Sequence, residues 1–384
     1  MSEPGLFALA LVPLGAWLWL LLLRGGFWLA GERDDRDEAS APAAWPAVTA
    51  VIPARDEADV IGEAVASLLA QDYPGGLKVI VVDDQSSDGT AGRARAAADG
   101  SERLEVIGGA PLPAGWTGKL WAVSQGVARA GADAPAYLLL TDADIRHGPG
   151  ALRGLVARAE RRRLVLTSLM VRLTCETWPE RLLIPAFVLF FQMLYPFAWV
   201  NRPGGKTAAA AGGCMLVRRE ALERAGGIAA IRGEIIDDCA LARRLKAEGP
   251  IWLGLGTRTG SLRPYRSVAE VGRMISRSAY AQLGYSPLVL AATVLAMVLV
   301  YVSPPLLLAF GHGPARWAAA AACALMAIAF QPTLMMYRRS PLWGLALPLI
   351  AALYAGFTVQ SAVEVWRGRG GMWKGRTQAL AGQP

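Results

Sequence analysis

The stretch YLLLTDAD, residues 137–144, decides how the chain is expected to fold. Its first half is a short apolar run that predicts a buried strand, and the run ends in two aspartates, Asp142 and Asp144. Residues two apart in an extended segment point to the same side, so both carboxylates are expected to face one crevice. They repel one another there unless a cation lies between them. A hard divalent ion bound by oxygen ligands would fit, and it can also hold a diphosphate.

Short apolar runs alternate with helical stretches upstream of this strand. Strands are expected at 48–52, 78–82 and 104–107, and helices at 59–71, 89–98 and 118–129. This alternation predicts an α/β fold with a mostly parallel sheet, in which ligands bind outside the carboxyl ends of the strands. A dinucleotide site would need GxGxxG after the first strand, but PARDE, residues 53–57, stands there. The sequence therefore argues against NAD or FAD.

The second strand ends in two acids, Asp83 and Asp84, at the start of DQSSDGT, residues 84–90. Carboxylates at such a strand end accept hydrogen bonds from ribose hydroxyls and base N–H groups, which suits a nucleotide. The alternative is a turn followed by a helix cap, because Ser86 and Asp88 are good capping residues. The sequence leaves both interpretations open.

A second acid pair, Asp237 and Asp238, follows two isoleucines and precedes a helical pattern. Acids in a first helical turn often serve only to stabilise the helix dipole. The chain has only two histidines, His147 and His312, so general base chemistry must rest mainly on carboxylates. A carboxylate beside apolar neighbours has a raised proton affinity, which suits the deprotonation of a hydroxyl. Asp238 is therefore a candidate base.

Basic residues that could meet phosphate are found in two places. Lys119 stands at the start of the helix expected at 118–129, where backbone N–H groups also favour anions. Four arginines precede the first C-terminal apolar run: Arg263, Arg266, Arg273 and Arg277. For them, diphosphate binding and anchoring on anionic lipid are both open.

The composition, 54% apolar with 18% charged residues, exceeds what a soluble domain can bury. The surplus lies at the chain ends, in four uncharged runs long enough to span a bilayer: 6–23, 286–310, 317–337 and 341–363. A fifth run, 182–200, contains two prolines and many aromatic residues, which favours helices in the membrane interface. We expect an anchor at 1–31, a central domain at 44–285 with the interfacial segment 182–200, transmembrane helices at 286–363 and a basic tail at 364–384.

The positive-inside rule does not settle the topology. With a cytoplasmic central domain, Arg24 and the pair Arg338–Arg339 lie inside, as the rule requires, but three full C-terminal spans place the basic tail outside. A re-entrant segment is the alternative. The net charge of +8 favours anionic partners, yet the charges border apolar segments and no nucleic-acid-binding module is present. Nucleic acid is therefore not an expected partner.

The order of these motifs resembles the family 2 glycosyltransferases with a GT-A fold. The resemblance runs from Val48 to about Gly284 and rests on five segments: VIPARDE (51–57), VVDDQSSDGT (81–90), TDADI (141–145), AAGGCMLVRREALERAGGI (210–228) and IIDDCALARRL (235–245). It implies a Rossmann-like catalytic domain that uses a nucleotide-sugar donor and a divalent metal, Mg²⁺ or Mn²⁺.

The resemblance also implies a role for each matching residue. Asp238 would be the catalytic base, and Asp142 and Asp144 would bind the metal and the donor phosphate. Further donor contacts are expected from Pro53, Arg55, Glu57, Asp84 and Lys119. The acceptor side is expected to include Gly212, Gly213, Cys214 and Asp237. Arg273 and Arg277 are further candidates for the diphosphate.

The terminal spans and the phrase GRMISRSAYAQLG, residues 272–284, further resemble the hopene-associated glycosyltransferases of bacteria. This implies a multi-pass protein of the bacterial inner membrane whose catalytic domain faces the cytoplasm. It would move a sugar, expected from UDP, to the hydroxyl of a membrane lipid, for which a hopanoid is the candidate. Processive polysaccharide synthases often carry Q/R-x-x-R-W, but here Met274 and Ser278 replace the first and last residues. A processive synthase and a non-enzymatic membrane scaffold remain the alternatives.

Overall fold

The computed structural model describes residues 3–36 and 41–377, and the end of the expected basic tail lies outside these residues. The chain divides into two compact units. The helical unit contains residues 3–31, 175–198 and 264–371, and the sheet unit contains residues 32–36, 41–174, 199–263 and 372–377. The segment after residue 371 therefore returns to the sheet unit.

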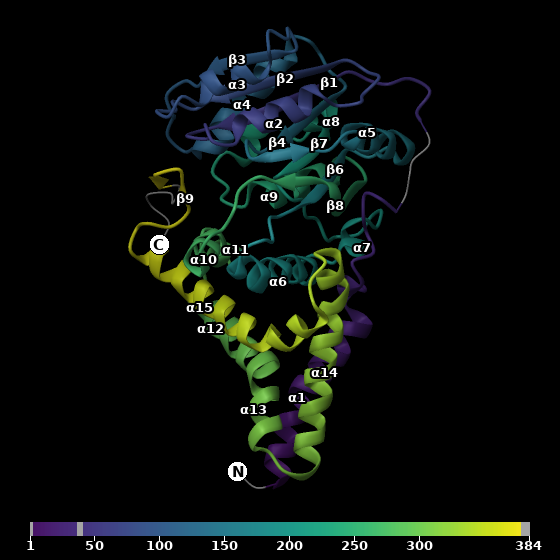
Figure 1. Ribbon diagram of the computed structural model, residues 1–384, viewed down its shortest axis with the longest axis vertical. Helices are drawn as coiled ribbons and strands as arrows, with labels where there is room; N and C mark the ends of the chain where they lie inside the picture. Colours follow the sequence, from purple (N-terminus) through teal and green to yellow (C-terminus); the bar gives the residue numbers. More distant parts are fainter. Residues whose placement is uncertain (1–2, 37–40, 378–384) are drawn as a thin grey trace. The chain divides into compact units, whose positions relative to one another are not determined.

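The sheet unit is built on one mixed eight-stranded sheet with the order β3-β2-β1-β4-β7-β6-β8-β5 (Figure 1). The strands are β1 (Val48–Ala54), β2 (Leu77–Asp83), β3 (Leu104–Gly108), β4 (Tyr137–Thr141), β5 (Ile145–His147), β6 (Leu166–Arg172), β7 (Cys214–Arg218) and β8 (Ile251–Ser261). The pairs β1–β2, β1–β4, β2–β3 and β6–β8 are parallel, whereas β7 and β5 run antiparallel to their neighbours. The predicted α/β fold with a mostly parallel sheet is confirmed.

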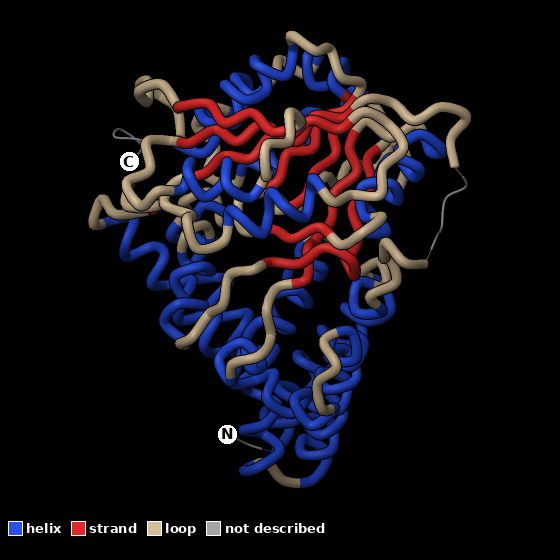
Figure 2. Tube along the Cα trace, turned by 45° about the horizontal axis from the view of Figure 1, so that its top comes forward, coloured by secondary structure: helices blue, strands red, loops and turns tan. Residues whose placement is uncertain are grey.

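The register of β1, β2 and β4 brings their carboxyl ends to one edge. Val48 pairs with Leu77 on one side and with Tyr137 on the other, so the three strands run in step. All seven residues of β1 are buried, which agrees with helices on both faces of the sheet (Figure 2). The acids that follow β2 and β4 therefore lie at the same edge, as expected.

Helices connect the strands and cover the sheet: α2 (Ile61–Leu69), α3 (Thr90–Ala97), α4 (Gly118–Gly131), α5 (Ala151–Arg162), α7 (Phe197–Val200), α8 (Arg219–Arg224), η2 (Ile228–Ile231) and α9 (Asp237–Glu248). Helix α4 lies very close to β1. A Cβ atom on Gly126 would stand only 2.4 Å from Val51 Cγ1, so this position has no space for a side chain. The close packing holds the start of α4, and with it Lys119, near the strand ends.

The helical unit contains five segments long and apolar enough to cross a membrane: 3–23, 178–200, 287–310, 313–336 and 341–366. Its elements are α1 (Glu3–Leu23), η1 (Phe27–Leu29), α6 (Trp178–Leu194), α10 (Val268–Ser276), α11 (Ala279–Gln282), α12 (Pro287–Met297), η3 (Val298–Val302), α13 (Ser303–Phe310), α14 (Gly313–Met336), η4 (Pro341–Ala346) and α15 (Leu347–Trp366). The four expected apolar runs at the chain ends are thus helical.

Two groups of helices can be distinguished within this unit. Helices α1, α13 and α14 pack on one another along their lengths (Figure 1), and the indole of Trp17 donates a hydrogen bond to the carbonyl of Val300. Helices α10 and α11 pack instead against α15. Helix α6 packs on both α14 and α15, and the hydroxyl of Tyr354 on α15 donates to the carbonyl of Leu183 on α6. The buried Glu180 accepts hydrogen bonds from the backbone N–H groups of Thr177 and Tyr265, which ties the start of α6 to the segment before α10.

The division into units differs from the expected boundaries of 44 and 285. Residues 175–198 and 264–285 group with the helices. Apart from its last segment, which starts at Met372, the sheet unit therefore ends at Arg263. The segment 178–200 is long and apolar enough to span, and its interfacial placement stays a prediction. A short hairpin of β9 (Met372–Trp373) and β10 (Arg376–Thr377) completes the sheet unit.

Candidate active site

A pocket opens at the edge where β1 and β4 end. Its lining includes Pro53 near the end of β1, Asp142 after β4, Lys119 from α4, Gly212 before β7 and Asp237 from α9. These residues are up to 184 positions apart in the chain, since Pro53 and Asp237 both line the pocket (237 − 53 = 184). The fold thus brings these five of the predicted site residues to one pocket.

Lys119 joins the two acidic motifs. Its Nζ atom lies 2.9 Å from Asp142 Oδ1 and 3.3 Å from Asp237 Oδ2. Lys119 lies in the first turn of α4. The N-cap residue Thr117 stabilises this turn, because its hydroxyl accepts a hydrogen bond from the backbone N–H of Leu120. A single ammonium group therefore offsets charge from both acid pairs, with 21% of its side chain still exposed.

The two aspartates of TDAD do not lie on an extended strand, so that expectation is wrong. Strand β4 ends at Thr141, and the backbone N–H of Ile145 donates to the carbonyl of Asp142 across a turn. Asp142 pairs with Lys119, whereas Asp144 Oδ2 accepts from Arg263 Nε at 2.8 Å. Burial raises the pKa of Asp142, and the charge of Lys119 opposes that rise. Each carboxylate thus has its own basic partner.

Asp238 lies in the first turn of α9, beside the apolar neighbours that the sequence placed there. Its Oδ2 atom accepts from the backbone N–H of Gly212 at 2.9 Å, and Oδ1 accepts from that of Cys239. Burial, together with the charge of Asp237, raises the pKa of Asp238 from 3.8 to about 6. The expected shift toward the working range of a base is therefore present.

The loop before β7 fits closely around these groups. A Cβ atom on Gly212 would stand 3.4 Å from Lys119 Nζ and 3.5 Å from Asp238 Oδ2, so a larger side chain would compete for their space. The carbonyl of Gly213 accepts from the hydroxyl of Thr141 at 2.8 Å, which connects this loop to the end of β4. Cys214 is fully buried in β7, and its part on the acceptor side stays a prediction.

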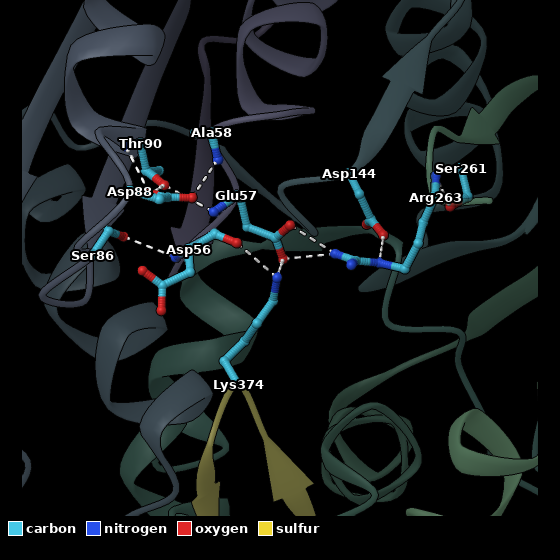
Figure 3. Close-up of polar contacts among 10 residues, drawn as sticks. All are labelled: Asp56, Glu57, Ala58, Ser86, Asp88, Thr90, Asp144, Ser261, Arg263 and Lys374. Atoms are coloured by element: carbon cyan, nitrogen blue, oxygen red, sulfur yellow. Dashed lines mark hydrogen bonds and ion pairs between the residues drawn. The ribbon is translucent and has the colours of Figure 1, made fainter. Parts of the chain in front are cut away.

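The loops after β1 and β2 bind one another. Arg55 Nη1 donates to the carbonyl of Asp84 and lies 3.8 Å from its carboxylate, which is almost fully buried. The carboxylate of Asp88 accepts from the backbone N–H groups of Ala58 and Thr90 (Figure 3). The N-cap residue of α3 is Gly89 and no side-chain cap hydrogen bond is present there, so Asp88 acts by binding the first residue of α3 and the loop after β1.

Two basic residues near Asp144 were not singled out from the sequence as site residues. Arg263 Nη2 donates to both oxygens of Glu57, at 2.8 and 2.7 Å, while its Nε donates to Asp144. Lys374 Nζ lies 2.9 Å from Glu57 Oε1 (Figure 3). Arg263 was visible only as one of four arginines, and Lys374 only as part of a basic tail. Arg273 and Arg277 lie on α10 and at its end, in the helical unit, and their diphosphate role stays a prediction.

The donor set suits a hard divalent cation. Among the described residues, no group of three or more His, Cys, Asp or Glu is arranged to hold a metal by itself. Mg²⁺ and similar ions are commonly bound by one or two carboxylates together with substrate phosphates, so a complete protein cage is not needed. Asp142 and Asp144 supply the two carboxylates, and each already binds a cationic group. The residues therefore fit a metal that binds together with a diphosphate.

Comparison with known proteins finds a matching family. Residues 49–226, which contain the ends of β1, β2 and β4 and the loop before β7, match the family described as Glycosyl transferase family 2. This part of the chain is similar to a family 2 glycosyltransferase. The matched part contains Lys119, Asp142 and Asp144, whereas Asp238 and Arg263 lie beyond it.

Two known proteins are similar to this chain, one in sequence over a short stretch and one in fold. The succinoglycan biosynthesis protein ExoU of Rhizobium meliloti (strain 1021) is 48% identical over 60 residues, which is 16% of this chain and 17% of that protein. The mannosyltransferase PcManGT from Pyrobaculum calidifontis, solved in complex with GDP-Man and Mn²⁺, aligns with a TM-score of 0.56 at 21% identity. The alignment covers 94% of this chain and 99% of that one. This likeness supports the fold described above.

Proposed function

We propose that the protein transfers a sugar from a nucleotide donor to the hydroxyl group of a membrane lipid, with inversion at the anomeric carbon. The observation that carries this proposal is the position of Lys119. It links Asp142, which follows the strand where donor phosphates are expected, to Asp237, the neighbour of the candidate base. Donor and acceptor chemistry therefore meet at one pocket.

The donor half of the reaction would use the loops at the strand ends. A nucleotide would bind near Arg55 and Asp84, and its diphosphate would lie between the carboxylates of TDAD and Lys119. The sequence resemblance favours UDP, whereas the similar archaeal structure holds GDP-Man, so both nucleotides belong in the tests. A divalent ion held by Asp142 and Asp144 would stabilise the charge of the leaving diphosphate.

Asp238 would act as the general base. A hydroxyl oxygen attacks the anomeric carbon, and its proton passes to the Asp238 carboxylate as the bond from that carbon to the diphosphate oxygen breaks. The backbone N–H groups of Gly212 and Cys239 hold this carboxylate in orientation. Lys119 remains close enough to offset charge on the diphosphate, which is the electrostatic part of the mechanism.

The helical unit supports a lipid as the acceptor. It supplies five segments long and apolar enough to cross a membrane within the same chain as the transferase domain. A soluble acceptor would not require apolar segments in the enzyme, whereas the hydroxyl group of a membrane lipid lies at the membrane surface. We place the protein in the bacterial inner membrane with the transferase domain on the cytoplasmic side, and a hopanoid is the candidate acceptor carried by the sequence resemblance.

The fall of kcat/KM at low pH should reflect the protonation of Asp238. Because its folded pKa is raised to about 6, the carboxylate is ionised above that pH and protonated below it. We expect kcat/KM to fall as the pH is lowered through about 6, approaching tenfold for each further pH unit. Asp237→Asn removes the neighbouring charge, so it should move this fall to lower pH. A fall near pH 4 in both proteins would contradict the role of Asp238.

The acceptor is tested by lipid mass spectrometry. Purified protein in lipid nanodiscs is incubated with Mn²⁺ and a panel of UDP- and GDP-sugars, with hopanoid and other hydroxyl-bearing lipids supplied. We expect one lipid to gain the mass of one sugar, and Asp238→Asn to give no product. A ladder of masses would instead indicate a processive synthase. Donor hydrolysis without any glycosylated lipid would contradict the proposed acceptor, and no reaction of any donor would favour a scaffold.

A further inference from the structure

The turn of the C-terminal hairpin lies against the loop that follows β1. Lys374 Nζ donates to the carbonyl of Asp56 at 2.9 Å and pairs with Glu57, while the carbonyl of Lys374 accepts from Arg55 Nε at 3.4 Å. One residue of the hairpin thus contacts three successive residues of the loop. All of these atoms belong to the sheet unit, although Lys374 is separated from Asp56 by 318 positions in the chain.

Lys374 occupies the turn of the hairpin. Arg376 pairs with Trp373, so only Lys374 and Gly375 form the turn, and both have positive φ, at 45° and 79°. A two-residue turn of this kind is normally built from Asn and Gly, because a larger side chain is strained at positive φ. Lys374 therefore occupies a turn position that is unfavourable for its backbone, and from there its ammonium group bonds the loop after β1.

Two acidic and two basic side chains meet around Glu57. Glu57 and Asp144 face Arg263 and Lys374, and the Glu57 carboxylate is shared by both cations (Figure 3). Arg263 binds only Oδ2 of Asp144, so the other oxygen could ligate a divalent ion, which would add positive charge beside Arg263 and Lys374. The diphosphate of the donor would then be the anion that offsets this charge.

We propose that Lys374 is a donor-binding residue, whose ammonium group, presented by the turn of the C-terminal hairpin, binds the diphosphate of the nucleotide sugar. This inference rests on the proposed function. A lysine is suited to the step, since it is a compact charge on a flexible stem that can leave Glu57 for a phosphate oxygen without moving the backbone. With 22% of its side chain exposed, Lys374 is accessible from solvent.

The test compares nucleotide affinities of the full-length protein in nanodiscs by calorimetry. UDP and GDP, and UMP and GMP, are each titrated with Mn²⁺ present. Lys374→Gln removes the charge but keeps a polar side chain, and Lys374→Arg keeps the charge. The matched control is Lys78→Gln, because Lys78 is an exposed lysine of the same unit paired with Asp133.

We expect Lys374→Gln to weaken binding of the preferred nucleoside diphosphate by roughly tenfold or more, and that of the monophosphate much less. Lys374→Arg should retain most of the affinity, and Lys78→Gln should match the wild type. Unchanged diphosphate affinity in Lys374→Gln would overturn the proposal. Tighter binding would also overturn it, because the hairpin would then obstruct the donor site. Failure of the wild-type protein to bind any of the four nucleotides would instead remove the proposed function, and this inference with it.

Discussion

Asp238→Asn is expected to abolish sugar transfer while the protein still binds its donor. The substitution preserves the size of the side chain, and the amide oxygen can still accept from the backbone N–H of Gly212. An amide cannot take up the proton of the attacking hydroxyl, so kcat should fall by about 10²–10⁴-fold, the range typical of a general base. Product formation by mass spectrometry measures the loss, and calorimetry with nucleoside diphosphate and Mn²⁺ measures donor binding.

Asp237→Asn is the matched control for this prediction. Asp237 is the neighbour of Asp238 on the same helix turn and pairs with Lys119, but it is not assigned the proton. We expect Asp237→Asn to retain measurable turnover and to shift its pH dependence. Transfer by Asp238→Asn within about tenfold of the wild-type rate would contradict the assignment of the base. Equal loss in both variants would point to a shared electrostatic role instead.

Lys119→Met is expected to cause the largest loss of donor affinity. Without the ammonium group, Asp142 and Asp237 lose a common partner, and the pKa of Asp142, already raised by burial, should rise further. A protonated carboxyl group is a poor metal ligand, and the diphosphate also loses a cation. We expect nucleoside diphosphate binding in Mn²⁺ to weaken by about 100-fold or more. The pKa of Asp238 should also rise, because Lys119 lowers it.

Two variants make this prediction specific. Lys78→Met removes an exposed lysine that is paired with Asp133, and it should bind the donor like the wild type. Lys119→Arg keeps the charge and should recover part of the affinity. Thermal unfolding of each variant shows whether the fold is intact. A folded Lys119→Met protein with an affinity within about threefold of the wild type would show that Lys119 does not bind the donor half.

The site residues that could be predicted from the sequence are mainly those that follow the ends of strands. An apolar run followed by acids predicts where a parallel strand stops, and parallel strands stop at the same edge. Lys119 was predictable for a similar reason, because helix α4 begins where its strand-end loop finishes. Asp238 became the candidate base because the chain has few histidines and because its neighbours are apolar.

The other contacts of the site join residues that are far apart in the chain, and no local sequence pattern predicts them. Arg263 is 119 positions from Asp144, and nothing in the sequence distinguishes it from Arg266, Arg273 or Arg277. The turn at Asp142 follows from the sheet order: β4 pairs with β7, but β5 pairs with β8 at the far edge, so the chain must change direction between Thr141 and Ile145. An extended segment was assumed there because the order of strands was not known.

The return of Lys374 to the sheet unit constrains how many times the chain can cross a bilayer between Arg263 and Met372. A chain that leaves a domain on one side of a bilayer and comes back to it crosses the bilayer an even number of times. Three apolar candidates lie between Arg263 and Met372, so at most two of them cross. A re-entrant segment, the alternative that the sequence left open, would satisfy this parity and would return the basic residues after Trp366 to the side from which the chain left.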